Sequence, residues 1–270
     1  GYMALLRNLR NIIEVGMDMN MLKIVHDRIS SRDEVIKSRQ LPFRFYAAYR
    51  ELTNIQRPEV QYILEALEKA AEHSAENVCG FNEDTPVFIA CDVSGSMQFP
   101  ISPKSSVMNY DIGILLGSIL KSKCKSVVTG IFGDTWLPAV GGPKCGVLEN
   151  TINMHKNANK VGFSTNGHLA IDWLLKENIK VDKLMFFTDM QMWNSRRDGG
   201  SLEKAWKAYK IFNPDAKLYL FDLRGYGQMP VRQTTDDVFL IAGWSEKVFE
   251  ILDAIEGGES ALEHIQQIEL

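Results

Sequence analysis

The sequence predicts an all-helical N-terminal segment followed by an α/β domain with a mostly parallel sheet. Before about residue 80, apolar residues recur at helical spacing. After it, short continuous apolar runs alternate with amphipathic segments, a pattern typical of buried parallel strands with helices on both faces of their sheet. The chain has 270 residues, 45% of them hydrophobic, and a net charge of −4, which suits one large globular domain or two modest ones.

Five helices are expected in the N-terminal segment. Pro42 separates the third from the fourth, and Pro58 stands in the first turn of the fifth. Ser31 or Asp33 is the expected N-cap of the third. Successive short helices of this kind favour an α-solenoid or a bundle, and we expect a solenoid that continues upstream. The expected helices cover residues 1–16, 20–30, 31–40, 43–54 and 57–78.

The second part alternates between strands and helices. Strands are expected over residues 87–91, 126–133, 183–189, 216–223 and 237–243. Helices are expected over residues 108–123, 166–178, 201–212 and 245–257, the last two capped by Ser201 and Ser245. Residues 133–140 are expected to form a loop.

The stretch TPVFIACDVSGSMQFP, residues 85–100, carries the strongest chemical signal. Its apolar run ends in Asp92, and Ser94 and Ser96 follow at alternate positions. Asp189 ends another apolar run, and Thr165 precedes a predicted helix. Ligands of open α/β sheets bind at the carboxyl ends of the strands. If the two strands are neighbours, these five residues lie at one edge of the sheet.

Such an edge is suited to a hard cation. Two facing carboxylates repel each other unless a cation lies between them. The serine and threonine hydroxyls complete a ligand set made of oxygen alone, which favours Mg²⁺, or another divalent cation such as Mn²⁺ or Ca²⁺.

Three other interpretations remain open for these residues. Asp92 and Asp189 each resemble an ordinary turn cap when taken alone. Ser94 as a hydrolase nucleophile lacks the G-x-S-x-G pattern and a histidine placed to serve it. Asp92 as a phosphoryl acceptor lacks a second acid two residues on, where Ser94 stands.

The five residues resemble the metal-ion-dependent adhesion site (MIDAS) of von Willebrand factor A domains. The resemblance implies that Ser94, Ser96 and Thr165 ligate the ion directly, and that Asp92 and Asp189 act mostly through water. It also implies an open coordination position that takes a carboxylate or another oxygen from a partner. Such domains are binding modules, so no catalytic residue and no enzymatic activity are expected.

The helical segment resembles the TROVE module of the Ro autoantigen family, through ALLRNLRNI at residues 4–12 and SRQLPFRFYAAY at residues 38–49. In that family a ring of HEAT-like helical repeats is closed by a von Willebrand A domain. The resemblance assigns residues 1–80 to the tail of such a ring and residues 81–270 to the A domain. We therefore expect the C-terminal part of a Ro-like protein, of the bacterial type.

The resemblance also implies the function of a ribonucleoprotein scaffold. Ro proteins bind noncoding Y RNA and misfolded RNA, and bacterial relatives are associated with exoribonucleases in RNA quality control. The ring as a whole holds the RNA, so this chain is expected to bind metal but to bind Y RNA weakly. The alternative is an A domain outside RNA biology that captures a partner's carboxylate through its ion.

Local support for RNA binding comes from cations interleaved with Phe43, Phe45, Tyr46 and Tyr49, because nucleic-acid sites combine phosphate contacts with base stacking. Aromatic residues at helical spacing are also typical of a helical core, and that alternative stays open. Two interpretations stay open for Trp193, Arg196 and Arg197: a partner surface near the ion, or packing of Trp193 under its own loop. The candidate RNA contacts are Arg7, Arg10, Arg32, Lys37, Arg39 and Arg44.

Composition favours a cytoplasmic location. The four cysteines form no C-x-x-C pair, as expected for reduced thiols. No apolar run approaches the roughly 20 residues needed to cross a membrane, so no membrane association is expected.

Overall fold

The computed structural model divides the chain into two compact units. Gly1–Asn77 group with Gly141–Asn153 in the first, and Val78–Val140 group with Met154–Leu270 in the second. The sequence predicted one boundary near residue 80, and the contacts add residues 141–153 to the helical part. The residues that the structure describes are 1–76, 83–103, 105–139, 146–191, 201–225, 230–231, 237–243, 251–252 and 255–256.

The first unit contains the five predicted helices, and Pro42 and Pro58 both stand at the start of their helices. The Ser31 hydroxyl accepts a hydrogen bond from the Glu34 N–H, which confirms Ser31 as the cap of α3. The long α5 packs against α2, α3 and α4. The helices are α1 (Tyr2–Val15), α2 (Met19–Ile29), α3 (Arg32–Ser38), α4 (Pro42–Leu52) and α5 (Pro58–Ser74).

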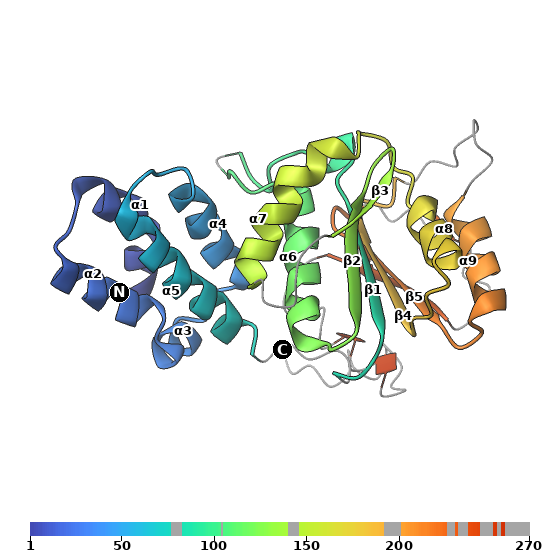
Figure 1. Ribbon diagram of the computed structural model, residues 1–270, viewed down its shortest axis with the longest axis horizontal. Coiled ribbons are helices and arrows are strands. Elements are labelled where there is room, and N and C mark those ends of the chain that lie inside the picture. The colour runs from blue at the N-terminus through green and yellow to red at the C-terminus, as the bar shows by residue number, and fades with distance from the viewer. Residues whose placement is uncertain are drawn as a thin grey trace. The chain divides into compact units, whose positions relative to one another are not determined.

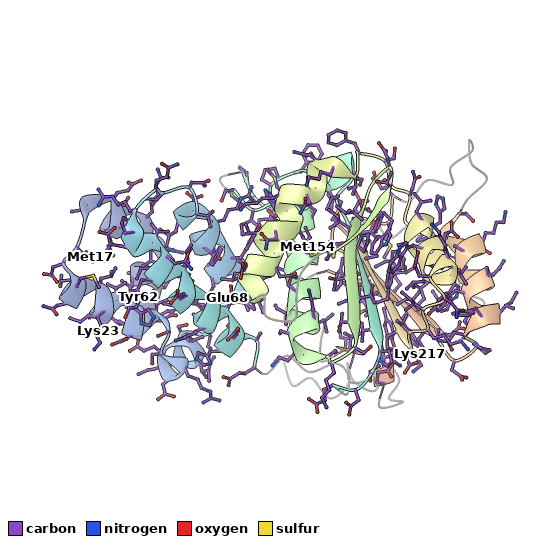
Figure 2. All side chains as sticks on the ribbon, viewed as in Figure 1. Met17, Lys23, Tyr62, Glu68, Met154 and Lys217 are labelled. Carbon is purple, nitrogen blue, oxygen red and sulfur yellow. The ribbon has the colours of Figure 1, made fainter. Side chains whose placement is uncertain are left out.

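A further helix, α7 (Val147–Asn157), was not predicted from the sequence. Its first turn is capped by Glu68 of α5, which Figure 2 labels: the carboxylate accepts from the N–H groups of Leu148 (2.8 Å) and Glu149 (3.1 Å). Burial raises the pKa of Glu68. Because the cap comes from a residue about 80 positions away, no local capping signal marks this helix.

The second unit is built on a six-stranded sheet in the order β3-β2-β1-β4-β5-β6 (Figure 1). All pairs are parallel except β2 with β3, which confirms the predicted mostly parallel sheet. Residues 136–138, predicted as loop, form the antiparallel edge strand β3. The strands are β1 (Val87–Asp92), β2 (Val127–Phe132), β3 (Trp136–Pro138), β4 (Lys183–Thr188), β5 (Lys217–Asp222) and β6 (Val238–Ala242).

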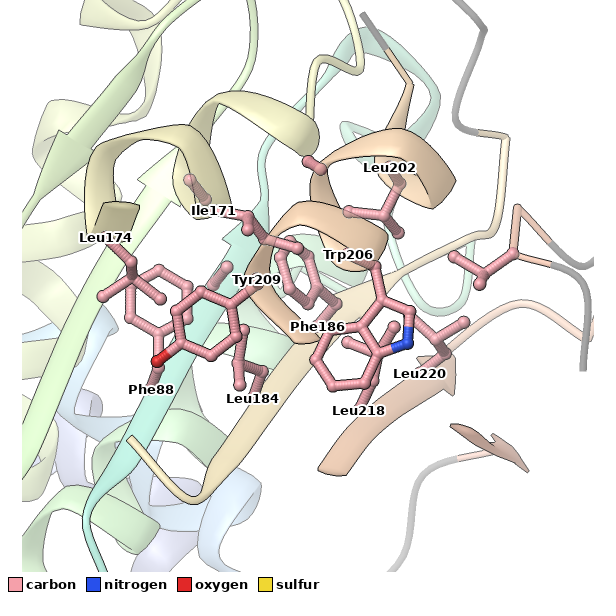
Figure 3. Close-up of a cluster of buried hydrophobic side chains, with 14 of the residues drawn as sticks. Phe88, Ile171, Leu174, Leu184, Phe186, Leu202, Trp206, Tyr209, Leu218 and Leu220 are labelled. Carbon is pink, nitrogen blue, oxygen red and sulfur yellow. The ribbon is translucent and has the colours of Figure 1, made fainter. Parts of the chain in front are cut away.

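Helices cover both faces of this sheet, as predicted. α6 (Asn109–Lys123) packs on one face, and α8 (His168–Lys176) and α9 (Leu202–Phe212) pack on the other (Figure 1). Ser201 caps α9 by accepting from the Lys204 N–H. Figure 3 shows the core beneath α8 and α9, where Phe88, Phe186 and Tyr209 are fully buried. Because helices cover both faces of the sheet, a ligand-binding site is expected at the carboxyl ends of the strands.

The C-terminal helix expected over residues 245–257 is described only in part. Residues 251–252 and 255–256 are helical, and Ser245 lies outside the described residues. No helix in the described part of the chain combines the length and apolar character needed to cross a bilayer.

Two glycines let α6 lie very close to the sheet. A Cβ atom on Gly113 would stand 2.9 Å from the Phe187 Cβ, and one on Gly117 would stand 2.8 Å from Ile89 Cγ2. Both distances are shorter than a van der Waals contact between carbons. The closeness of α6 to β1 and β4 therefore depends on glycine at these two positions.

We predict that Gly117→Ala destabilises the protein by about 1–3 kcal/mol, because the new methyl group overpacks the contact with Ile89. Urea unfolding followed by circular dichroism measures this loss. Ser122→Ala, at an exposed position of the same helix, is the control and is expected to change stability little. A Gly117→Ala protein as stable as the parent would contradict the close packing.

Candidate metal centre

The site begins with the pairing of β1 and β4. These strands are parallel neighbours, with Cys91 opposite Phe187, so both chains leave the sheet at the same edge. The Thr188 hydroxyl, one residue beyond that pair, donates a 2.6 Å hydrogen bond to Asp92 Oδ2. Asp189 follows directly, and the structure brings it close enough for its charge to act on Asp92.

Asp92 is almost fully buried and uses both of its oxygens. Oδ1 accepts from the Ser94 N–H at 2.9 Å, which closes the turn after β1, and Oδ2 accepts from Thr188. The pKa of Asp92 is raised to about 7, mainly by burial and in smaller part by the nearby Asp189, while hydrogen bonds from Ser94 and Thr188 oppose the rise. A positive charge beside the two acids would favour their ionised forms.

Asp189 is fully buried and satisfies only one of its oxygens. Oδ1 accepts from the Gln191 N–H at 3.1 Å, while Oδ2 has no hydrogen-bond donor among the described residues. A buried carboxylate oxygen without a donor is costly, and such groups are normally bonded or coordinated to a metal. The arrangement therefore fits an ion beside Asp189 Oδ2.

Asp92 and Asp189 both act as turn caps, which is the alternative that the sequence left open. In each case, Oδ1 accepts a hydrogen bond from the backbone N–H two residues further along the chain. The capping role accounts for one oxygen of Asp189 and leaves its Oδ2 unexplained. Turn capping is therefore part of the structure of this edge and is compatible with a cation there.

The two serines lie together on the turn after β1. Ser94 Oγ is 3.3 Å from Ser96 Oγ, and the two residues flank Gly95 at the start of a 3₁₀ turn, Gly95–Met97. The Ser94 hydroxyl thus lies beside the Ser96 hydroxyl and the Asp92 carboxylate. Such a cluster of oxygen atoms is suited to a hard cation.

The loop that carries Thr165 lies against the same turn. The Gly95 N–H donates to the Phe163 carbonyl at 2.9 Å, and the Asn166 N–H donates to the Gly133 carbonyl at 3.0 Å. Thr165 itself is buried. The loop is thus fixed on both sides of Thr165, once to the Ser94–Ser96 turn and once to the end of β2.

Asp134 holds this loop from the side of β2. Its Oδ1 accepts from the Ser164 N–H at 2.8 Å, and Gly162, at φ +79°, leaves no room for a Cβ beside the Asp134 carboxylate. Hydrogen bonds from Ser164 lower the pKa of Asp134. Asp134 therefore positions the residue before Thr165.

The described residues contain no group of three or more histidine, cysteine, aspartate or glutamate side chains that would hold a metal. The candidate centre differs from such clusters, because it combines two carboxylates with three hydroxyls. Ligands made of neutral and anionic oxygen suit a hard ion of the Mg²⁺ kind.

Sequence reasoning missed three residues at this edge. Thr188 belongs to the same FFTD run as Asp189, but a threonine inside an apolar strand carries no special signal. Asp222 ends β5 as Asp92 ends β1, and its Oδ1 accepts from the N–H groups of Arg224 and Gly225. The pattern of an apolar strand followed by an acid, already seen at Asp92, could have indicated Asp222. No sequence pattern marks Asp134.

The candidate RNA contacts all lie in the first unit and are exposed. Arg10 pairs with Glu14 (3.0 Å) and Glu51 (3.4 Å), and Arg32 pairs with Glu76 (2.7 Å). These two cations are therefore already engaged. Exposed ion pairs are weak and can exchange for phosphate, so the pairing weakens the prediction without removing it. The six residues are Arg7 and Arg10 on α1, Arg32 and Lys37 on α3, Arg39 at the end of α3, and Arg44 on α4.

The interleaved aromatic residues divide between core and surface. Phe45 and Tyr46 are fully buried, so these two belong to the helical core and cannot stack on bases without unfolding. Phe43 is partly exposed, and the Arg44 guanidinium lies 5.0 Å from its ring centre. The predicted partner surface at Trp193, Arg196 and Arg197 lies outside the described residues.

The fold combines a helical part with an α/β part whose sheet is mostly parallel. Residues 1–88 match the model of the TROVE domain family. A sequence comparison with curated proteins gives no match.

Among solved structures, the chain is similar to the Ro (RSR) protein of Deinococcus radiodurans, with a TM-score of 0.63 and 19% identity. The match covers 96% of this chain and 53% of that one, so this chain spans about half of its length. A manganese-loaded TRAP protein of Plasmodium vivax matches with a TM-score of 0.40 and 13% identity, over 66% of this chain and 74% of that one.

Residues 1–88 are therefore similar to the TROVE domain, and the chain as a whole shares the fold of the Deinococcus radiodurans Ro (RSR) protein. The expected fold class, a helical part followed by an α/β part with a mostly parallel sheet, is confirmed.

We predict that Asp134→Ala weakens binding of Mn²⁺ by about 10-fold to 100-fold, the usual effect of removing a residue that orients a ligand. The loop before Thr165 loses its acceptor for the Ser164 N–H. Isothermal titration calorimetry measures the affinity, and Asp172→Ala, at an exposed position of α8, is the control. Equal affinities for both variants would contradict the positioning role of Asp134.

Proposed function

We propose that this protein is a non-enzymatic RNA-binding scaffold of the Ro type, whose A domain binds a divalent cation. The observation that carries the RNA part is the TROVE match over residues 1–88. The observation that carries the metal part is the buried Oδ2 of Asp189, which has no donor among the described residues. The two parts are tested separately.

For the metal, we infer that Ser94, Ser96 and Thr165 supply neutral oxygens and that Asp92 and Asp189 supply the negative charge. Mg²⁺ is the proposed ion, with Mn²⁺ or Ca²⁺ as substitutes, because the ligand set contains only oxygen. A bound divalent cation supplies an electrophilic position for an oxygen of a partner. This chain's own part is to hold the acids in place, through the bond from Thr188 to Asp92 and the turns at Ser94 and Gln191.

For RNA, we infer that the exposed cations of α1 and α3 contact phosphates. Arg7, Lys37 and Arg39 are the most suitable, because ion pairs already engage Arg10 and Arg32. The proposed ligand is noncoding RNA of the Y type, bound by the helical part.

We further propose that the protein works in the cytoplasm in RNA quality control, with an exoribonuclease or another protein at the metal centre. Cys91 and Cys124 are free thiols, which supports a reducing compartment. An A domain that binds only protein partners, outside RNA biology, is the competing function. The RNA experiment below distinguishes the two.

We predict that Mg²⁺ stabilises the parent against heat and leaves Asp189→Asn unchanged. A ligand at 100 times its dissociation constant adds about 2.7 kcal/mol of stability, which corresponds to roughly 5–10 °C for an α/β unit of this size. Differential scanning fluorimetry with and without Mg²⁺ measures the shift. Asp182→Asn, an exposed acid just before β4, is the control and is expected to keep the full response. A parent that does not respond to Mg²⁺ would contradict metal binding.

We predict that replacing Arg7, Lys37 and Arg39 together by glutamine weakens binding of a single-stranded RNA and flattens its salt dependence. Each lost phosphate contact reduces the slope of log K against log salt by about 0.7 for single strands, so about 2 for three contacts. Fluorescence anisotropy across a salt series measures both quantities. Lys204→Gln, at an exposed position of α9, is the control. Binding by this chain is expected to be weak, because the chain spans about half of the similar Ro protein. Weak binding by the parent that does not respond to salt favours the competing function.

A further inference from the structure

Two lysines face each other at the amino ends of β4 and β5, the edge of the sheet opposite the candidate metal centre. Lys183 begins β4 and Lys217 begins β5, and the two residues are directly paired in the parallel register. Figure 2 labels Lys217. Residues paired in this way point to the same face of the sheet. Their two ammonium groups therefore repel each other unless an anion lies beside them.

Tyr219 adds a hydroxyl to the same face. It stands two residues after Lys217 on β5, and side chains two apart on a strand share a face. Tyr219 is fully buried, and its ring stacks on Phe239 of β6 with 5.0 Å between the ring centres. The Lys217 Nζ lies 5.8 Å from the centre of the same Phe239 ring. The two strands thus present two ammonium groups and one phenol hydroxyl from neighbouring positions.

The carboxylate of Glu256 accepts hydrogen bonds from all three groups. Lys183 donates to Oε2 and Tyr219 donates to Oε1. Lys217 also donates to Oε1, at 3.2 Å. Because Glu256 lies 73 residues beyond Lys183 in the chain, no local sequence pattern predicts this cluster. One carboxylate from the C-terminal part of the chain thus fills an anion position that two strands build.

Burial makes an anion necessary at this position. Lys183 is only 9% exposed, and burial lowers its pKa, whereas the bond to Glu256 opposes that change. For Glu256 itself, burial acts to raise the pKa, but the hydrogen bonds from Lys183 and Tyr219 outweigh burial and lower it. A buried ammonium group is costly without an opposite charge beside it. The three donors are therefore arranged around an anion.

We propose that Lys183, Lys217 and Tyr219 form a binding site for a phosphate group, and that Glu256 occupies this site as an internal competitor. A phosphate monoester carries about −1.5 to −2 charge at pH 7 and three acceptor oxygens. It therefore offers one oxygen to each of the three donors and a charge that matches two lysines. A carboxylate offers two oxygens and one charge. The internal phosphate of a nucleic-acid strand also has a single charge, so the proposed ligand is inorganic phosphate or a phosphate monoester.

The site is open to solvent on the side of Lys217. The side chains of Lys217 and Glu256 are 32% and 25% exposed. An incoming phosphate therefore meets Lys217 first and replaces the Glu256 carboxylate without any change in the sheet. Because Glu256 belongs to the same chain, its effective concentration at the site is high. The affinity of the parent for phosphate is reduced by the fraction of molecules in which Glu256 has left the site.

Isothermal titration calorimetry with inorganic phosphate, at constant ionic strength, tests the proposal on the full chain. Glu256→Gln keeps the size of the side chain and removes its charge, so this variant is expected to bind phosphate at least tenfold more tightly than the parent. Adding Lys217→Met to the same variant should cancel the gain. Asp215→Asn, which alters an exposed acid two residues before β5, is the control and should bind phosphate as the parent does.

A second variant covers the case in which Glu256→Gln does not fold. Glu256→Asp keeps the negative charge on a shorter stem, so the cluster retains its internal anion in a poorer position. We expect this variant to bind phosphate more tightly than the parent, by a smaller factor than Glu256→Gln. The gain should again disappear when Lys217→Met is added.

A matched pair of labelled oligonucleotides separates the two sources of phosphate. Both carry fluorescein at the 3′ end, and one has a 5′-phosphate where the other has a 5′-hydroxyl. Tighter binding of the phosphorylated strand to Glu256→Gln, lost on adding Lys217→Met, would identify the end of a nucleic acid as the source. Equal binding of the two strands, together with the gain for inorganic phosphate, would identify a small free phosphate.

Two results would overturn the proposal. If the folded variants of Glu256 bind phosphate no more tightly than the parent, the three donors serve only to hold Glu256 in place. If the gain survives Lys217→Met, the phosphate binds elsewhere on the protein. Neither result bears on the metal centre, because the proposed ligands of the ion lie at the carboxyl edge of the sheet.

Discussion

Parallel pairing of β1 with β4 is the constraint on which the rest of the site depends. It places Asp92 beside Thr188 and Asp189 at one edge of the sheet, with both acids buried. A shift of one residue in this register would turn alternate side chains to the opposite face of the sheet and separate the acids. Because the strands are central and buried on both faces, core residues such as Phe88 and Phe186 hold this register in place.

Asp92 and Asp189 each have a structural role at this edge. One oxygen of each closes a turn, which any aspartate at the end of a strand could do. The remaining oxygens differ, because Thr188 satisfies Asp92 and no described group satisfies Asp189. Burial and mutual repulsion make this edge unfavourable for a carboxylate alone, as the raised pKa of Asp92 indicates. A cation would remove that cost, and the surrounding hydroxyls suit it.

Much of this could be predicted from the sequence, because the informative patterns are local. The continuous apolar runs predicted the parallel strands, and acids at their ends predicted the edge. What could not be predicted depends on distant contacts. The helix α7 is capped by Glu68 of α5, and the loop of Thr165 is held by Asp134. The three-residue strand β3 is too short to give a period. In the helical unit, periodicity did not separate stacking aromatics from core, and burial assigns Phe45 and Tyr46 to the core.

The most direct test of the metal centre is a crystal structure of the protein soaked with Mn²⁺, with anomalous scattering used to locate the ion. We expect one strong anomalous peak within coordination distance of the Ser94 and Ser96 hydroxyls, on the side of the Asp189 Oδ2 atom. A crystal that shows no peak there at saturating Mn²⁺, with the two acids ordered, would contradict it.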